Sequence, residues 1–488
     1  MPPAFPQITS RREMLSRCGL GMGALSLVPL LQQTAVGTES AGSGSFISPL
    51  ASRESHFPAR AKRIIHIFPE GGPSQVDTFD EKPALDQYHG SGVNEVQKDY
   101  TKNGVVVAIR QQVGRLSGKI KRSAFPFTKH GESGIPVSNL FPKLARHVDE
   151  MCIVRSMRTS SSVHEPAQLM MNTGDVIQAR PSLGSWAVYG LGTENENLPA
   201  FVALSPNGTT SSGDKHWSNV FLPSWSRGTA MATEDTSVDR LLEHLRSGST
   251  SLSEQRRQLD LLARLNHRHQ AVRPGQALLE GRITSFETAF RMQVEATDAF
   301  DIAREPLPVR EMYGDTQQGR QLLLARRLVE RGVRFVQVWH KGWDTHDEND
   351  ERHRDLCGAA DQPLAALLED LRQRDLLRDT LVIWAGEFGR TPTADNNDVA
   401  SKKSIGRDHN AAGFTIWMAG GGVKRGFIYG ATDELGAVAV ENPVDVHDLH
   451  ATILHLLGFD HEQLTHRHAG RDFRLTDVHG RVVREILA

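Results

Sequence analysis

Five acidic and histidine side chains stand next to short apolar segments that lie far apart in the sequence. They are Asp77, Asp344, His346, Glu387 and His409. Carboxylate oxygens and imidazole nitrogens are ligands of divalent ions such as zinc, manganese, calcium and magnesium. Each signal is weak alone, because an Asp-x-His pair is more often a hydrogen-bonded turn than a metal site. Their value depends on whether the fold brings them together.

The apolar segments are expected to form strands that alternate with helices. The expected strands cover residues 63–68, 151–154, 198–204, 335–339, 380–385 and 414–419. The expected helices cover residues 142–147, 164–172, 319–331, 364–371 and 446–457. This alternation indicates an α/β fold with a mostly parallel central sheet and helices on both faces. Ligands of such sheets bind beyond the carboxyl ends of the strands. The pattern therefore predicts one metal site at that edge, with one or two ions.

The first expected strand leads into a turn with two acidic candidates. Glu70 adjoins the end of the strand, and Asp77 follows the pair Gly71 and Gly72. A glycine pair permits a sharp turn, so either carboxylate can face the site. We favour Asp77, because Glu70 precedes a turn that can swing it outward.

The composition limits the class of protein. The chain has 488 residues, 39% of them hydrophobic, which suffices for one large α/β domain or two smaller ones. A formal net charge of -2 gives no indication of a nucleic-acid partner. Residues 252–292 alternate apolar and charged residues at helical spacing, broken at Pro274. We expect a helical insertion at about 250–300 whose apolar stripe is packing surface.

Three cysteines occur, Cys18, Cys152 and Cys357, and none belongs to a Cys-x-x-Cys pattern. A zinc site made of thiolates is therefore not expected. Cys18 lies in a segment that we expect to be removed. Cys152 and Cys357 could form one disulfide, but we expect two free, mostly buried thiols.

The amino terminus has the pattern of an export signal. Arg11 and Arg12 precede an apolar run at 18–31 that is too short for a comfortable membrane span. The paired arginines resemble a twin-arginine signal, which exports folded proteins; an ordinary secretory signal is the alternative. We expect a signal peptide at 1–37, a flexible leader at 38–60 and an exported protein, periplasmic or secreted. No second long apolar run follows, so no membrane span is expected in the mature chain.

Several motifs together carry a resemblance to a known family. They are Gly-Gly-Pro-Ser-Gln-Val-Asp-Thr-Phe-Asp at 71–80, Arg-Ser-Met at 155–157 with His164, Gly-Trp-Asp-Thr-His at 342–346, Gly-Glu-Phe-Gly-Arg-Thr-Pro at 386–392 and Gly-Arg-Asp-His at 406–409. From about 63 to 473 the chain resembles the sulfatase-like family called domain of unknown function 1501. That family resembles the alkaline phosphatase superfamily of metal-dependent phosphate and sulfate ester hydrolases. The resemblance implies an alkaline phosphatase/sulfatase-like domain at 61–480.

The resemblance also implies metal ligands. Glu387 stands where sulfatases have the metal-binding aspartate of Ser-Asp-His-Gly, and Phe388 stands where several of these enzymes have a histidine ligand. Asp344 and His346 resemble the superfamily's Asp…His pair, with tighter spacing. His409 resembles the late histidine ligand.

The position of the nucleophile departs from the sulfatase pattern. Residues 164–174 fit the frame Cys-x-Pro-Ser-Arg-Ala-Ala-Leu-Leu-Thr-Gly without a gap, with His164 at the cysteine and Gln168 at the arginine. Histidine cannot become formylglycine, so ordinary sulfatase chemistry is not expected. His164 could be the nucleophile or a metal ligand. Alternatively, a serine at 160–162 or a water activated by the metal could attack.

Two functions agree with these residues. The first is an exported metal-dependent hydrolase of phosphate or sulfate esters, without the usual Cys or Ser nucleophile, acting on an anionic small molecule or glycan. His164 would then be catalytic, and Arg390 and Arg407 (or Arg155 and Arg158) could neutralise the anion, although ordinary ion pairs are the alternative for each arginine. The second is a non-catalytic exported protein that binds a polyanion or sulfated glycan. Phe388 and His164 favour the second, whereas the cluster of carboxylates and histidines favours the first.

Overall fold

The structure, a computed structural model, describes residues 50–93, 95–96, 118–177, 180–195, 197–210, 212–241, 252–271, 297–394 and 405–488. They belong to one compact unit, Pro49–Ala488. The predicted signal peptide, with Cys18, and residues 38–49 of the predicted leader lie outside the described residues. The described end of that leader is hydrogen-bonded to the domain, with Arg53 N donating to Leu191 O at 2.9 Å and Arg60 N donating to Leu456 O at 2.9 Å.

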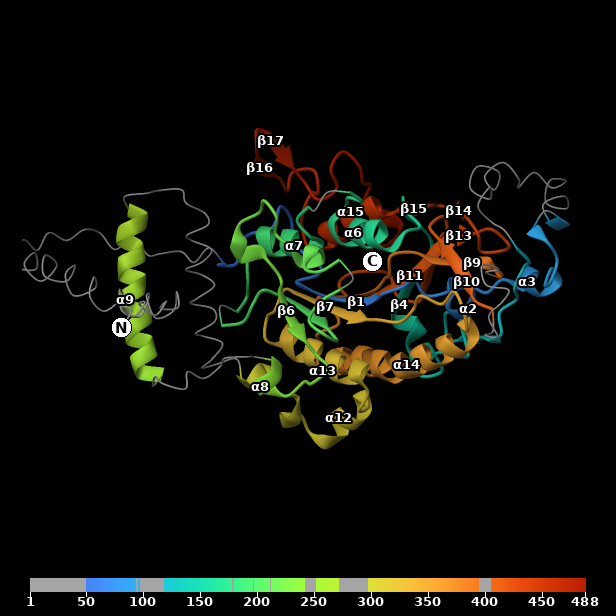
Figure 1. The fold of residues 1–488 in the computed structure, drawn as a ribbon, viewed down its shortest axis with the longest axis horizontal. Helices are drawn as coiled ribbons and strands as arrows, with labels where there is room; N and C mark the ends of the chain where they lie inside the picture. The colour runs from blue at the N-terminus through green and yellow to red at the C-terminus, as the bar shows by residue number, and fades with distance from the viewer. Residues whose placement is uncertain are drawn as a thin grey trace, which may run out of the picture. The chain divides into compact units, whose positions relative to one another are not determined.

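Nine strands of the described residues form one central sheet (Figure 1). Their order is β12 (Phe427–Tyr429), β4 (Met151–Arg158), β11 (Phe414–Ala419), β8 (Thr380–Trp384), β1 (Arg63–Pro69), β7 (Phe335–His340), β5 (Phe201–Ser205) and β6 (Thr229–Ala232), with β15 (Val444–Asp445) beside β4. All neighbouring pairs are parallel except those of β11, which is antiparallel to both β4 and β8. The predicted α/β fold with a mostly parallel sheet is therefore confirmed.

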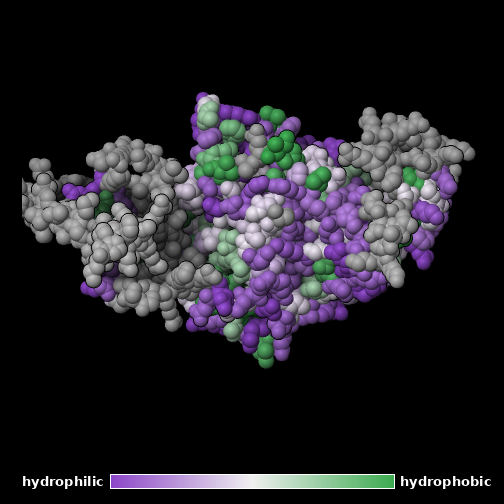
Figure 2. Space-filling view, in the orientation of Figure 1, coloured by the Kyte–Doolittle hydropathy of each residue, from purple (hydrophilic) through white to green (hydrophobic). Residues whose placement is uncertain are grey.

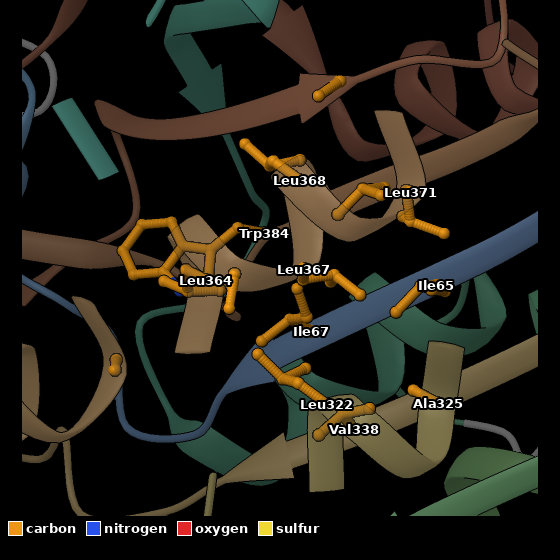
Figure 3. Close-up of a cluster of buried hydrophobic side chains, with 14 of the residues drawn as sticks. Ile65, Ile67, Leu322, Ala325, Val338, Leu364, Leu367, Leu368, Leu371 and Trp384 are labelled. Atoms are coloured by element: carbon orange, nitrogen blue, oxygen red, sulfur yellow. The ribbon is translucent and has the colours of Figure 1, made fainter. Parts of the chain in front are cut away.

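Helices cover both faces of this sheet (Figure 1). On one face lie α13 (Gln317–Glu330) and α14 (Asn349–Gln373), and on the other α6 (His164–Thr173), α7 (Leu183–Leu191) and α15 (Val446–Leu456). Successive side chains of a strand point to opposite faces, so β1 contributes to two apolar cores. Ile65 and Ile67 lie in the core beneath α13 and α14, as Figure 3 shows, whereas Ile64 and Phe68 lie in the other. Each such buried side chain contributes about 1.5–3 kcal/mol.

Smaller elements complete the unit. They are α2 (Gln75–Thr78), α3 (Pro83–Gln87), β2 (Phe127–His130), β3 (Ile135–Ser138), the 3-10 helices Leu144–Glu150, Lys215–Trp217, Ser224–Ser226, Ile302–Arg304 and Arg484–Ile486, α8 (Val238–Leu241), α11 (Thr297–Phe300), α12 (Leu307–Tyr313), β9 (Gly389–Ala394), β10 (Arg407–Asn410), β13 (Ala431–Thr432), β14 (Ala439–Glu441), β16 (His466–His468) and β17 (Arg471–Phe473). Of the predicted helical insertion, the structure describes α9 (Leu252–Ala271); residues 272–296, with Pro274, lie outside the described residues.

The topology brings distant segments to one edge of the sheet. The carboxyl ends of β1, β4, β7 and β8 share this edge, and the amino end of β11 joins them because that strand runs the other way. The segments that follow β1, β7 and β8, and the one that precedes β11, carry the predicted ligands. Cys152 and Cys357, as predicted, are free and buried.

Candidate metal centre

The Asp344 carboxylate lies at the middle of a group of cationic and imidazole side chains. Its Oδ1 is 3.1 Å from His346 Nε2, 3.1 Å from His409 Nε2 and 2.8 Å from the Arg390 guanidinium. Its Oδ2 is 3.3 Å from His164 Nε2. The structure thus brings together three of the five predicted ligands and adds His164 to them.

Two of the imidazoles present nitrogen atoms to the same point. His409 Nδ1 lies 2.7 Å from the carbonyl oxygen of Ser162, which can only accept, so Nδ1 carries the proton. When the ring is neutral, His409 Nε2 therefore has no proton and carries a free lone pair. It lies 2.9 Å from His346 Nε2 as well as close to the Asp344 carboxylate. A lone pair beside a carboxylate oxygen is an arrangement that a cation stabilises.

His164 faces this centre from the first residue of α6. The helix begins with Val163 as N-cap, and no side chain caps it. Just before the helix, Ser161 Oγ accepts from Val163 N at 3.1 Å, and the Ser162 carbonyl accepts from His409 Nδ1. His164 Nδ1 lies 2.9 Å from Glu387 Oε1, which leaves Nε2 toward Asp344. The ring of Phe388 packs against His164 and His409, with centroids 5.1 and 4.4 Å away.

The charges of this centre favour a positive group between its carboxylates. Burial acts to lower the pKa of His164, but its contacts with Asp344 and Glu387 raise that pKa to about 9. Burial acts to raise the pKa of Asp344, but the contacts with His164, His346 and His409 and the charge of Arg390 hold it well below its usual range. Asp344 therefore stays ionised beside two cationic groups, His164 and Arg390.

The residues present fit a divalent ion. Two groups of three residues, which share His409, each have donor atoms within 4.8 Å of one another. They are His164, Asp344 and His409, and His346, Asp408 and His409. Glu387 belongs to neither group, although its wholly buried Oε2 has no hydrogen-bond partner among the described residues. Two or three nitrogens with one carboxylate oxygen suit zinc better than calcium, magnesium or manganese, which favour oxygen ligands.

Asp77 and Arg407 lie elsewhere, as a buried ion pair. Asp77 Oδ2 accepts from Arg407 Nε at 2.8 Å, from Ser74 Oγ at 2.6 Å and from Asn349 Nδ2 at 3.1 Å. Burial acts to raise the pKa of Asp77, but the Arg407 guanidinium holds it well below its usual range. Both side chains are wholly buried, and Asp77 belongs to neither donor group. The structure therefore pairs a predicted ligand with a predicted anion-binding residue.

Arg390 is also wholly buried, and its donors are used within the chain. It donates to the carbonyl oxygens of Gly72 at 2.9 Å, Arg407 at 3.0 Å and Trp343 at 3.0 Å, to that of Gly71, and to Asp344 Oδ1. It thus joins the turn after β1 to the segment after β7. Arg155 and Arg158 contact Asp80 and Asp445.

Glycines allow these segments to lie against one another. Gly71 has a φ of 118°, and a Cβ on it would lie 2.2 Å from Asp344 N. A Cβ on Gly406 would lie 2.1 Å from the carbonyl carbon of His346. Any larger residue at either position would displace the backbone that carries a candidate ligand.

Sequence reasoning missed two members of the centre. Asp408 joins the group of His346 and His409, and the signal was its place directly before His409. The Ser162 carbonyl, which fixes the ring of His409, has no side-chain signal at all. Glu387 reaches the centre through His164, which lies 223 residues away in the sequence. Glu70 belongs to neither donor group.

These features define an α/β protein with a candidate metal centre at the edge where the parallel strands of its sheet end. The chain belongs to the family described as Protein of unknown function (DUF1501), whose pattern matches residues 61–487. The expected family is therefore confirmed. No curated protein matches the sequence.

Three solved structures illustrate the wider similarity. Ps i-CgsB in complex with k-i-k-neocarrahexaose has a TM-score of 0.36 and 10% identity, over 82% of this chain and 72% of that one. The PsFucS1 sulfatase from Pseudoalteromonas sp. has a TM-score of 0.34 and 11% identity, over 83% and 69%. The alkaline phosphatase from the Antarctic bacterium TAB5 has a TM-score of 0.31 and 12% identity, over 74% and 92%. These scores are too low to transfer any site residue.

Proposed function

We propose that the protein is an exported, metal-dependent hydrolase of phosphate or sulfate esters. One observation supports this most strongly: His164, His346 and His409 all turn Nε2 toward the carboxylate of Asp344. Imidazole nitrogens gathered around one carboxylate are the donor set that a divalent ion such as zinc takes in proteins. The side chains of Asp344, His164 and His346 are 30–45% exposed, so a ligand can enter from solvent.

The residues of the centre divide into two roles. Asp344 and His409, with His164 or His346, would hold a divalent ion, and the ion would polarise the ester and neutralise its charge. If His346 completes the ligand set, His164 can hold a proton at Nε2 for the leaving or attacking oxygen; if His164 itself is the ligand, Nε2 is occupied by the ion. Because Arg390 and Arg407 are buried and engaged, we propose structural roles for both, and the ion itself offsets the charge of the substrate.

A non-catalytic binding protein is the second candidate. The contacts of the apolar Phe388 ring with His164 and His409 favour it, because an apolar wall reduces the polar groups that can act on a substrate. The cysteines of the described residues are buried, so neither can serve as a nucleophile at this edge.

Metal analysis and turnover separate the two candidates. The purified protein is loaded with Zn²⁺, Mn²⁺, Ca²⁺ or Mg²⁺ and assayed with aryl phosphates and aryl sulfates. We expect one bound metal at least, with turnover that falls about 10²–10⁴-fold in His164→Ala. His468→Ala, which alters an exposed histidine of β16, is the control. Bound metal without turnover of any ester would instead support the binding protein.

Export is proposed from the paired arginines at 11 and 12. Among the described residues, no helix has both the length and the apolar character needed to cross a membrane. The face in Figure 2 is mainly hydrophilic where residues are described, with apolar residues in small groups. Replacing Arg11 and Arg12 by lysine should retain the protein in the cytoplasm of the expressing cell, as fractionation can show. Unchanged export would instead indicate the ordinary secretory route.

A further inference from the structure

Within the part of the chain that the structure describes, the Glu387 side chain makes its hydrogen bonds through one oxygen, Oε1. Oε1 accepts from the backbone N of Gly71 at 2.8 Å, from His164 Nδ1 at 2.9 Å and from Gln168 Nε2 at 3.2 Å. The side chain is wholly buried. A carboxylate oxygen has about two lone-pair sites, so three donors leave Oε1 no capacity for an ion.

The partner of Glu387 that faces the centre is His164. An imidazole that donates Nδ1–H to a carboxylate must present Nε2 as the ligand atom. His164 forms one donor group with Asp344 and His409, and its Nε2 lies 3.3 Å from Asp344 Oδ2. The contact with Glu387 thus fixes both the orientation of the ring and the nitrogen that it offers.

Neutral and backbone groups hold Glu387 in this position. Gln168, one helical turn after His164, adds an N–H without adding a charge that would compete for the carboxylate. The helix is anchored at this point, because Asn172 Nδ2 donates to the backbone carbonyl of Gln168 at 2.8 Å and Gln337 Nε2 of β7 donates to Asn172 Oδ1 at 2.5 Å. This buried polar chain ties the start of α6 to the centre of the sheet.

We propose that Glu387 is a positioning residue for His164: it holds the ring with Nδ1 protonated and Nε2 toward Asp344, and does not itself bind the ion. This rests on the proposed metal site. It differs from the ligand role that the sequence suggested for Glu387. If Glu387 were instead a ligand, it would bind the ion through its other oxygen, Oε2.

A double-mutant cycle with Zn²⁺ alone distinguishes these roles. Zn²⁺ affinity is measured against a chromogenic chelator for the full chain and for Glu387→Gln, His164→Ala and the double variant. Glu387→Gln keeps the shape of the side chain and should weaken binding about 10–100-fold. If Glu387 acts only through His164, the double variant binds no more weakly than His164→Ala. Losses that add in the double variant would overturn the proposal.

A matched control and a spectroscopic measurement complete the test. Glu165→Gln makes the same change at the next residue of α6, where the side chain is exposed and paired with Lys215, and should leave the affinity unchanged. With ¹⁵N-histidine labelling, His164 should show a downfield Nδ1–H proton that moves upfield in Glu387→Gln, with or without Zn²⁺. An Nδ1–H signal that does not respond would overturn the proposal. If the protein binds no Zn²⁺, the proposed function fails, and this signal still decides the role of Glu387.

Discussion

His346 Nε2 and His409 Nε2 lie 2.9 Å apart, and each is 3.1 Å from the same oxygen of Asp344. Since the proton of His409 resides on Nδ1, the Nε2 atom of the neutral His409 ring carries a lone pair that faces His346. Both histidines thus contact the carboxylate of Asp344. Its replacement is therefore the most direct test of the centre.

Asp344→Asn should lower the affinity for Zn²⁺ by more than about 100-fold, because it removes the one negative ligand that both histidines share. Titration against a chelator measures the change. Asp347→Asn is the matched control, since Asp347 pairs with Arg352 and belongs to neither donor group. Equal effects of the two substitutions would argue against a centre built on Asp344.

Asp77→Ala should destabilise the fold by about 3–5 kcal/mol, because it leaves the wholly buried Arg407 without its carboxylate. Denaturant unfolding measures this loss. The folded fraction should keep the Zn²⁺ affinity of the unaltered protein. If affinity falls while stability is unchanged, Asp77 is a ligand after all.

Acid should destabilise the protein through histidines that are buried in neutral form. Burial lowers the pKa of His66 and His353 to about 4 and that of His450 to about 3, although hydrogen bonds to backbone carbonyls act in the opposite direction. Between pH 6.5 and 4 the histidines of the unfolded chain take up protons that those of the folded chain do not. Their contribution to the free energy of unfolding is therefore fully present above pH 6.5 and is lost as the pH falls. The loss at pH 5 should be on the order of 1–2 kcal/mol per histidine.

Denaturant midpoints measured from pH 7.5 to 4.5 test this pH dependence. His450→Gln should flatten the curve by the contribution of one histidine, since His450 Nε2 lies 2.9 Å from the Met171 carbonyl and the glutamine amide can reach and donate to that carbonyl without titrating. A curve that stays as steep in this variant would show that His450 does not take part.

Gly71→Ala should weaken both stability and Zn²⁺ binding, because its Cβ would lie 2.2 Å from Asp344 N. Gly90→Ala separates this clash from backbone strain. Gly90 also has a positive φ, 83°, but nothing lies within 4 Å of its Cβ, so only about 1 kcal/mol of conformational strain is expected. Thermal unfolding and Zn²⁺ titration of both variants should show a loss of affinity for Gly71→Ala alone.

Much of the fold could be predicted from the sequence, because strands that are buried on both faces of the sheet consist of continuous apolar runs. The apolar run of β8 at Thr380–Trp384 and the helical spacing of α15 are visible without coordinates. The meeting of Asp344, His346 and His409 at one edge followed from topology alone. What the topology does not determine is the direction in which a side chain points.

Asp77 and Glu387 illustrate this limit. Both follow strands at the predicted edge, yet Asp77 turns toward Arg407, 330 residues away, and Glu387 turns toward His164. Buried carboxylates take the partners that best satisfy them, and those partners come from parts of the chain whose proximity no spacing rule reveals. Arg390 likewise is engaged by backbone carbonyls, which carry no residue-specific signal.

The reversal of β11 has a consequence for the lifetime of the folded protein. His409 lies in β10, directly before β11, and β11 enters the sheet between β4 and β8, two strands from distant parts of the chain. Such long-range contacts form late in folding, so an ion held there would leave the folding rate nearly unchanged and would slow unfolding instead. Chelation should accordingly shorten the half-life of the native state far more than it delays its formation.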